Sequence, residues 1–232
     1  MLTIRNANER GHTQAGWLNA RHSFSFNTYY DPKHMGFRSL RVINDDRIAP
    51  GTGFGKHPHR DMEIITWVLE GQLEHEDSMG NRAVLRPGQM QRMSAGTGIY
   101  HSERNASSTE PIHLFQIWIQ PDTEGIAPRF EDLPLTDADL RNKLFLAASP
   151  DGRNGSSVIQ QSAFVYASKL DANRSVDHPL EGNRHAWLQV ATGRVNVNGH
   201  DLEAGDAIAA SDEKQLHIHA AEDSAILLFD LA

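Results

Sequence analysis

The sequence contains no cysteine, an excess of acidic over basic residues and no long hydrophobic run. Without cysteine the chain can form no disulfide, offer no thiolate to a metal and use no cysteine nucleophile, so any metal must be held by nitrogen and oxygen donors. The 22 lysines and arginines stand against 30 aspartates and glutamates, for a formal net charge of −8. Because no basic run could follow a phosphate backbone, we expect no nucleic-acid binding.

Membrane insertion and secretion are also disfavoured. Uninterrupted apolar runs reach no more than five or six residues, whereas roughly 20 are needed to cross a bilayer. The opening stretch, MLTIRNANERGHTQAGW, carries charged and amide residues where a secretory signal would need an apolar block. We therefore expect no membrane span and a cytoplasmic location.

Short β-like runs separated by turn signals dominate both halves of the chain, which is typical of an all-β sandwich or barrel. In the first half these runs lie at 39–44, 62–71, 83–90 and 112–120. The proline-rich, acidic segment 121–136 shows no sustained period and is interpreted as a linker, with a capped helical turn beginning at Thr136.

The two halves resemble each other. WVLEGQL (67–73) with LRPGQM (85–90) matches WLQVATGRV (187–195) with LEAGDA (202–207). In both copies an apolar strand ends at a glycine, Gly71 or Gly193, where a backbone with positive φ would favour glycine. The sequence therefore predicts a duplicated β-barrel, with an N-terminal domain over 1–130 and a C-terminal domain over 131–232.

Two short histidine–carboxylate patterns lie in the first half. His57, His59 and Glu63 share the same strand parity, and His101 and Glu103 are again two residues apart. Side chains two apart on a strand share a face and sit roughly 7 Å apart, close enough for two imidazoles to converge on one ion. Imidazole plus carboxylate, with positions left open, is the donor set of non-haem iron and related metal centres.

Each pattern also has an ordinary explanation. His57 and His59, with a proline between them, could be surface or turn histidines, because an isolated HxH is a weak signal. His101 and Glu103 could lie in a solvated loop after the glycine-rich turn SAGTG. The second pair strengthens the first, because it follows that turn at the distance a barrel needs to return to the same end.

The motifs resemble those of a known family. Gly51, His57, His59, Glu63 and Gly71 are similar to the first cupin motif. The second cupin motif is matched by Pro87, Gly88, His101 and Asn105. The stretches RVINDDRIAPGTGFGKHPHRDMEIITWVLEG, MSAGTGIYHSE and SFSFNTYYDP resemble the pirin subgroup, and over essentially the whole chain the similarity extends to its bacterial quercetin 2,3-dioxygenases.

This resemblance implies an all-β bicupin, two tandem jelly-roll barrels with few short helices, and one metal centre in the N-terminal barrel. The implied ligands are His57, His59, His101 and Glu103. Most cupins take the carboxylate from the first motif, which would be Glu63, whereas pirins take it from the second. Glu63 is then expected to support a ligand imidazole by hydrogen bonding, without touching the metal.

The C-terminal barrel is expected to lack a metal site. When Gly193 is aligned with Gly71, the positions equivalent to His57, His59 and Glu63 are occupied by Pro179, Glu181 and His185. The paired imidazoles are therefore missing. The HxH at His217 and His219 lacks a converging partner pair and is interpreted as two same-face strand residues. The histidines without a spacing partner are assigned structural or surface roles; these are His12, His22, His34, His75, His113, His178 and His200.

The resemblance implies a dioxygenase that opens the heterocyclic ring of flavonols such as quercetin with dioxygen and releases carbon monoxide. Glu103 is the candidate base for the substrate hydroxyl proton. The metal would be divalent, with iron(II) favoured and manganese, nickel, cobalt, copper or zinc chemically allowed. Aromatic and apolar residues near the motifs are either pocket lining or barrel core, namely Phe54, Met93, Phe115 and Trp118.

Two other functions fit the same residues. Eukaryotic pirins are described as transcriptional co-regulators, so a metal centre that senses redox state while the barrel surface docks a protein partner is the alternative. A purely structural metal is disfavoured, because structural sites are usually closed by four protein ligands. Since no heptad or helical stripe suggests assembly, we expect a monomer.

Overall fold

The computed structural model describes residues 1–232 and is almost entirely β-structure, as predicted. It contains 22 strands, one α-helix of four residues and two single-turn 3-10 helices. No helix is long and apolar enough to cross a membrane. The chain forms two compact units, which we call the N-terminal barrel (11–135 with 159–161) and the C-terminal barrel (1–10, 136–158 and 162–232).

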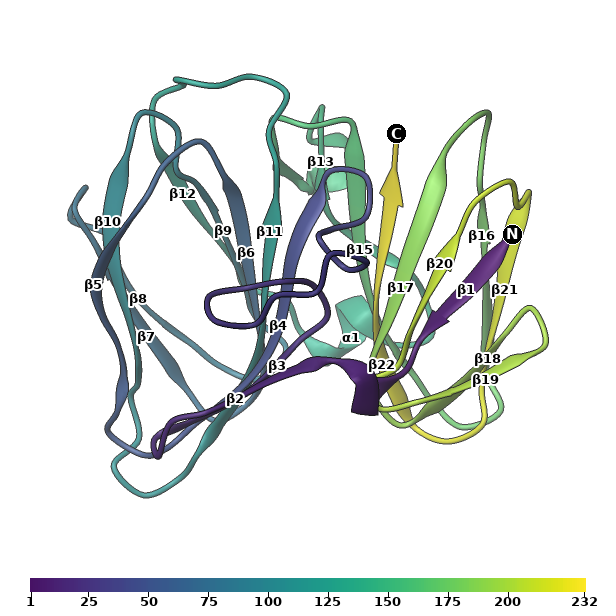
Figure 1. Cartoon of the computed structure of the whole chain (residues 1–232), viewed down its shortest axis with the longest axis horizontal. Coiled ribbons are helices and arrows are strands. Elements are labelled where there is room, and N and C mark those ends of the chain that lie inside the picture. Colours follow the sequence, from purple (N-terminus) through teal and green to yellow (C-terminus); the bar gives the residue numbers. More distant parts are fainter. The chain divides into compact units, whose positions relative to one another are not determined.

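The N-terminal barrel consists of two antiparallel sheets that face each other (Figure 1). The larger sheet has the order β12-β9-β6-β11-β4-β3-β2, and the smaller one has the order β5-β10-β7-β8. The strands are β2 (Gly11–Gln14), β3 (Leu18–His22), β4 (Leu40–Ile48), β5 (Gly53–His59), β6 (Glu63–Glu70), β7 (Leu73–Asp77), β8 (Arg82–Leu85), β9 (Met90–Ser94), β10 (Ile99–Asn105), β11 (Ile112–Ile119) and β12 (Arg129–Leu133).

The C-terminal barrel repeats this arrangement with sheets ordered β1-β20-β17-β22-β15-β13-β14 and β16-β21-β18-β19, which are antiparallel apart from the parallel pairing of β13 with β14. Its strands are β1 (Leu2–Arg5), β13 (Phe145–Ser149), β14 (Ser157–Val158), β15 (Ala163–Leu170), β16 (Ser175–Pro179), β17 (His185–Thr192), β18 (Arg194–Val197), β19 (His200–Glu203), β20 (Ala207–Ala210), β21 (Gln215–Ala220) and β22 (Ser224–Leu231). The predicted helical turn after Thr136 is α1 (Asp137–Leu140), and Thr136 forms a capping box with Asp139.

The first strand of the chain belongs to the C-terminal barrel. β1 pairs antiparallel with β20, residue for residue from Leu2 opposite Ala210 to Arg5 opposite Ala207, and Figure 1 shows the two strands side by side. It takes the position that β12 has beside β9 in the N-terminal barrel. The start of the chain thereby supplies the strand that covers an otherwise open sheet edge. The domain boundary predicted at residue 130 did not anticipate this pairing, because it assigned residues 1–10 to the N-terminal domain.

The two repeat glycines have the backbone conformation that the sequence suggested. Gly71 has φ +77° and Gly193 has φ +78°. A Cβ on Gly71 would lie 2.6 Å from the carbonyl oxygen of Pro111, so a side chain is excluded by contact as well as by φ. Each glycine therefore allows a turn that another residue would strain.

Each barrel has its own hydrophobic core, made by the alternate side chains that point between its two sheets. In the N-terminal barrel these include Ile48, Val68, Leu73, Leu85, Ile112 and Leu114. The corresponding core of the C-terminal barrel includes Leu188, Val190, Val197, Ile208, Leu216, Ile218, Ile226 and Leu228. Each such side chain contributes about 1.5–3 kcal/mol when fully buried. This leaves the mouth of each barrel for polar groups.

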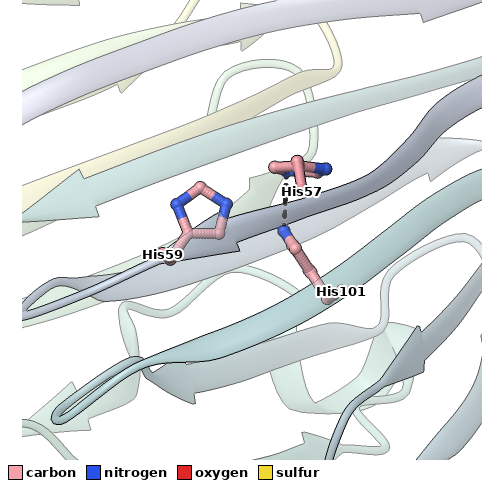
Figure 2. A group of neighbouring side chains, drawn as sticks. All are labelled: His57, His59 and His101. Carbon is pink, nitrogen blue, oxygen red and sulfur yellow. Dashed lines mark hydrogen bonds between the residues drawn. The ribbon is translucent and has the colours of Figure 1, made fainter.

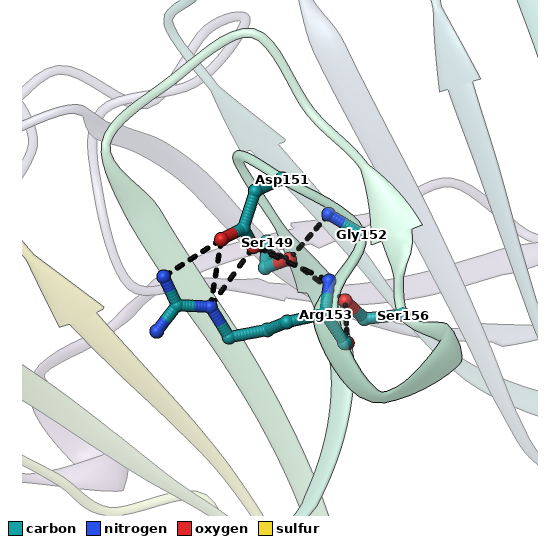
Figure 3. Close-up of polar contacts among 5 residues, drawn as sticks. All are labelled: Ser149, Asp151, Gly152, Arg153 and Ser156. Atoms are coloured by element: carbon teal, nitrogen blue, oxygen red, sulfur yellow. Dashed lines mark hydrogen bonds and ion pairs between the residues drawn. The ribbon is translucent and has the colours of Figure 1, made fainter.

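A polar loop between β13 and β14 is held by its own side chains (Figure 3). Arg153 donates from Nε and Nη2 to the carboxylate of Asp151, at 2.9 and 2.7 Å. The backbone N–H of Gly152 donates to the Ser149 hydroxyl at 3.0 Å, and Ser149 and Ser156 share a hydroxyl contact of 2.7 Å. These contacts fix the turn that returns the chain to the sheet.

Candidate metal centre

The histidine pairs lie on adjacent antiparallel strands of the smaller sheet. On β5 and β10, His57 is directly opposite His101, and His59 is opposite Ile99. A β-bulge between His101 and Glu103 shifts the register, so that Glu103 is opposite Phe54. Side chains two apart on each strand share a face, and the pairing brings both motifs to one place.

Three imidazoles converge in this place (Figure 2). The ring centroids are 4.4 Å apart for His57 and His101, 4.7 Å for His59 and His101, and 4.8 Å for His57 and His59. One nitrogen from each ring lies within 4.8 Å of the other two. The closest contact is 2.9 Å between Nε2 of His57 and Nε2 of His101. Three nitrogen donors gathered in this way could hold one metal ion.

Glu103 adds a buried carboxyl group to the same centre. Its side chain lines the same cavity as His57 and His59, and its ligand atom forms a second close trio with His75 and His101. Its carboxyl oxygens accept hydrogen bonds from Gln116 Nε2 at 2.6 Å and from Thr66 Oγ1 at 3.3 Å. Burial raises the pKa of Glu103, and the nearby histidines only partly counter this.

The four residues expected as ligands are thus gathered in one barrel, while Glu63 is bonded elsewhere. Glu63 is buried on β6 and accepts a hydrogen bond of 2.7 Å from the Ser94 hydroxyl. The backbone of Gln160 is a second partner of its carboxyl group, and burial raises the pKa of Glu63. The expected hydrogen bond from a ligand imidazole to Glu63 is not formed.

His75, which the sequence placed among structural or surface histidines, is fully buried against the centre. It lies on β7 opposite Glu103 of β10. Gln91 contacts its Nδ1 at 3.0 Å, and Phe130 stacks on its ring with a centroid distance of 4.8 Å. Burial lowers the pKa of His75. The parity of Leu73, His75 and Asp77 was a usable signal, but only the pairing of β7 with β10 shows where the ring points.

The protonation state of the imidazoles suits a divalent metal. Burial, together with neighbouring imidazoles, lowers the pKa of both His59 and His101 to about 3. Both rings are therefore neutral at neutral pH, as metal ligation requires. The His57 Nδ1–H donates to the Gly55 carbonyl at 2.7 Å, so the lone pair of that ring is on Nε2, the nitrogen that faces His101.

Buried nitrogen atoms without hydrogen-bond partners indicate whether the residues of the centre could bind a metal ion. Nε2 of His59 and Nδ1 of His101 are buried and make no hydrogen bond. Buried polar atoms are normally paired, so an unpaired one needs an explanation. A divalent transition metal at the convergence of these rings would pair His59 Nε2. The residues present therefore fit the group that the donor pattern suggests.

The centre opens to a cavity of about 350 Å³. Its walls are formed by Phe26, Asn27, Asn44, Asp46, Phe54, His57, His59, Glu103, Gln116 and Trp118. Trp118 meets the His59 ring edge-on at 4.9 Å, and Phe26 meets Trp118 at 5.4 Å. The sequence left four residues as either pocket lining or barrel core, and of these Phe54 and Trp118 line the cavity. Met93 and Phe115 are fully buried and absent from its walls.

In the C-terminal barrel the equivalent positions are mostly apolar. His178 lies opposite Leu216 as His57 lies opposite His101, and Ile218 stands where Glu103 would be. The sequence alignment on Gly193 was wrong by one residue, because the segment from His178 to Gly193 is one residue longer than the segment from His57 to Gly71. The residue equivalent to His57 is therefore His178 and not Pro179. His217 and His219 face outward on β21, as expected for same-face strand residues, and His217 is 56% exposed.

The fold and site together define a two-barrel cupin with a histidine-rich centre in its first barrel. Residues 3–119 match the family model described as Pirin, and residues 146–231 match that of a quercetinase C-terminal cupin domain. The chain belongs to the pirin family, which confirms the family and the bicupin fold expected from its motifs.

Similar proteins match over their whole length. A protein of Escherichia coli (strain K12) named quercetin 2,3-dioxygenase is 51% identical over 231 residues, which cover 100% of this chain and 99% of that protein. The crystal structure of YhhW from Escherichia coli has a TM-score of 0.96 at 50% identity, covering 100% of this chain and 98% of that one. A structure of the same bacterial pirin with nickel(II) has a TM-score of 0.94 at 49% identity, with coverages of 100% and 99%.

Proposed function

We propose that the protein is a metal-dependent dioxygenase that opens the heterocyclic ring of flavonols such as quercetin, consuming dioxygen and releasing carbon monoxide. Relatives that match over their full length carry the name quercetin 2,3-dioxygenase, which makes the chain an oxidoreductase of the dioxygenase class. The observation that carries the proposal is the convergence of three imidazoles and a buried carboxyl group beside an aromatic-walled cavity.

His57, His59, His101 and Glu103 would hold a divalent metal, which supplies Lewis acidity and a template for substrate and dioxygen when bound. The His57 Nδ1–H···O=C bond to Gly55 orients that ring, and the low pKa of His59 and of His101 keeps both rings neutral. The nickel complex is of YhhW and supports a divalent metal here. Iron(II) is our first choice for the native ion.

The cavity walls suit a flat aromatic substrate. Phe26, Phe54 and Trp118 present ring surfaces, and a volume of about 350 Å³ is within the usual range for small-molecule sites. Apolar walls also exclude water from the reacting carbon atoms. The aromatic walls would therefore bind and orient the ring system next to the imidazoles.

Glu103 is the group that can take a proton from the substrate hydroxyl. Burial raises the pKa of its carboxyl group, which makes the carboxylate a stronger base than one in water. Gln116 and Thr66 donate hydrogen bonds to its two oxygens and fix its position. The proton would move from the flavonol hydroxyl to a Glu103 carboxylate oxygen.

The test is reconstitution of the purified protein with iron(II), manganese(II), cobalt(II) or nickel(II) under anaerobic conditions, followed by admission of air in the presence of quercetin. We expect loss of quercetin absorbance, one carbon monoxide per quercetin consumed, and no turnover in the double variant His57→Ala, His59→Ala. Stoichiometric metal without turnover of any flavonol would instead support the redox-sensing or partner-docking alternative. Gel filtration of the same samples tests the expected monomer.

A further inference from the structure

The wall of the metal-site cavity contains one carboxyl group that no other part of the protein satisfies. Asp46 lies on β4 and is only 2% exposed, yet its Oδ1 is buried without a hydrogen-bond partner. No hydrogen bond to either of its carboxyl oxygens is formed within the protein. Asp46 is also one of the residues that line the cavity.

The other buried acidic side chains of the molecule have polar partners. Glu103 is bonded to Gln116, Glu63 to Ser94, Asp77 to Asn81 and Asp230 to His178. Asp46 contributes the only carboxyl oxygen among the buried side-chain atoms that lack a partner. An unpaired buried polar group lowers stability, so a carboxyl group kept in this state indicates a role that packing does not explain.

Two neighbouring polar side chains of the cavity, Asn44 and Gln116, already form hydrogen bonds within the protein. The Asn44 amide oxygen contacts Nδ1 of His22 at 2.7 Å. Gln116 donates to Glu103 from its nitrogen, and its oxygen accepts from Trp118 at 3.2 Å. Asp46 therefore differs from these two neighbours in having a buried oxygen atom without a partner.

The chemistry of the ligand follows from the charge of the cavity. Two carboxyl groups, those of Asp46 and Glu103, face the cavity, which disfavours a ligand that enters with a carboxylate or phosphate group. A carboxyl oxygen accepts a hydrogen bond from a hydroxyl group in either protonation state, so the unpaired Oδ1 of Asp46 can pair with a hydroxyl donor. A neutral, polyhydroxylated aromatic molecule matches this wall.

We propose that Asp46 is a specificity-determining residue that hydrogen-bonds a ring hydroxyl of the substrate other than the hydroxyl held at the metal. This proposal rests on the proposed flavonol function and deepens it, because it states which kind of flavonol is preferred. Flavonols with a ring hydroxyl that reaches Asp46 bind tightly. By contrast, 3-hydroxyflavone has only the hydroxyl held at the metal and forms no hydrogen bond with Asp46.

The test is anaerobic calorimetric titration of the metal-loaded protein with a panel of flavonols that each lack one hydroxyl, with 3-hydroxyflavone as the minimal member. Wild type is compared with Asp46→Leu, which removes the polar group, and with Asp46→Asn, which keeps its size and hydrogen bonding. We expect Asp46→Leu to raise the Kd of quercetin at least tenfold, to leave 3-hydroxyflavone unchanged, and to raise Tm. We expect Asp46→Asn to restore most of the affinity.

A double-mutant cycle identifies the hydroxyl concerned. The flavonol that lacks it should bind wild type about tenfold more weakly than quercetin and bind Asp46→Leu as well as quercetin does. Equal Kd values for wild type and Asp46→Leu, or the same loss for every flavonol including 3-hydroxyflavone, would overturn the role of Asp46 alone. A wild-type protein that binds no flavonol would contradict the proposed function itself and this proposal with it.

Discussion

Nε2 of His57 lies 2.9 Å from Nε2 of His101 across the pairing of β5 with β10. In the metal-free protein, two neutral ring nitrogens this close share a proton. Since the His57 Nδ1–H donates to Gly55, the shared proton comes from His101. A metal ion bound by both rings replaces this proton, so the contact marks where metal binding and proton release are coupled.

Removal of either ring should therefore abolish metal binding. We expect His57→Ala and His101→Ala, purified and reconstituted anaerobically, to retain less than about a tenth of the metal content of wild type, because each ring supplies one of the four donors that would hold the ion. The measurement is metal per chain by elemental analysis after dialysis. His217→Ala is the matched control, since this histidine also belongs to an HxH but faces outward. Wild-type metal content in His101→Ala would contradict the assignment of the centre.

Stability of the metal-free protein should fall as the pH is lowered. The pKa of His59 and of His101 is about 3 in the folded protein, compared with 6.5 for a free histidine. Between these values the unfolded chain binds protons that the folded protein does not. The free energy of unfolding therefore loses about 1.4 kcal/mol per pH unit for each group as pH falls, and neither group contributes a slope above about pH 7.

Urea unfolding in the presence of a chelator at pH 7, 6, 5 and 4 measures this dependence. The buried carboxyl groups of Glu63 and Glu103 oppose it, because their raised pKa values favour the folded state in acid. The comparison with His59→Asn isolates the contribution of His59, since the free energy of unfolding of this variant should fall less steeply with decreasing pH. Parallel curves for wild type and His59→Asn would show that His59 titrates normally.

The sequence correctly predicted which side chains of the centre share one face of a strand. The spacing of His57, His59, His101 and Glu103 places pairs on one face of a strand, and the structure brings all four into one barrel. What it could not predict depends on pairing between strands that are distant in the chain. His75 reaches the centre only because β7 pairs with β10.

Two other features show the same limit of local patterns. Asp46 lies on the opposite sheet from the ligands, and nothing in RVINDDRI indicates which of its acidic residues points inward. The pairing of β1 with β20 joins positions about 200 residues apart and leaves no local signal. The glycine repeat gave the barrel architecture, but one additional residue before Gly193 was enough to shift the alignment of His178.

Replacement of Glu103 by Gln should stop turnover without loss of substrate binding. The amide cannot accept the hydroxyl proton as the carboxylate can, while its oxygen can still accept the hydrogen bond from Gln116. We expect kcat to fall at least about 100-fold when both proteins are compared at equal metal occupancy. Quercetin consumption and carbon monoxide release are the measurements, and Glu181→Gln in the C-terminal barrel is the control. Full activity in Glu103→Gln would remove its assignment as the base.

His75→Leu should weaken metal binding without eliminating it. The ring lies opposite Glu103 and is positioned by Gln91 and Phe130, so its loss frees the ligands to move. Loss of such supporting groups typically lowers metal affinity by about 10- to 100-fold. Competition with a chelator of known affinity measures the change, and His200→Ala on β19 is the control. A metal Kd equal to that of wild type would show that His75 only packs against the site.

Gly71→Ala tests whether the repeat glycine is required by contact as well as by backbone conformation. A methyl group there would meet the carbonyl oxygen of Pro111 at 2.6 Å, whereas Gly80, with φ +91°, has open space around its Cβ position. Both substitutions force alanine into the left-handed region, at a cost of about 1–2 kcal/mol, but only Gly71→Ala adds a steric clash of similar size. We expect Gly71→Ala to lower the free energy of unfolding by about 3 kcal/mol and Gly80→Ala by about 1 kcal/mol. Equal losses in urea unfolding would mean that the neighbouring turn at Pro111 relaxes, and that conformation alone requires glycine where the apolar strand ends.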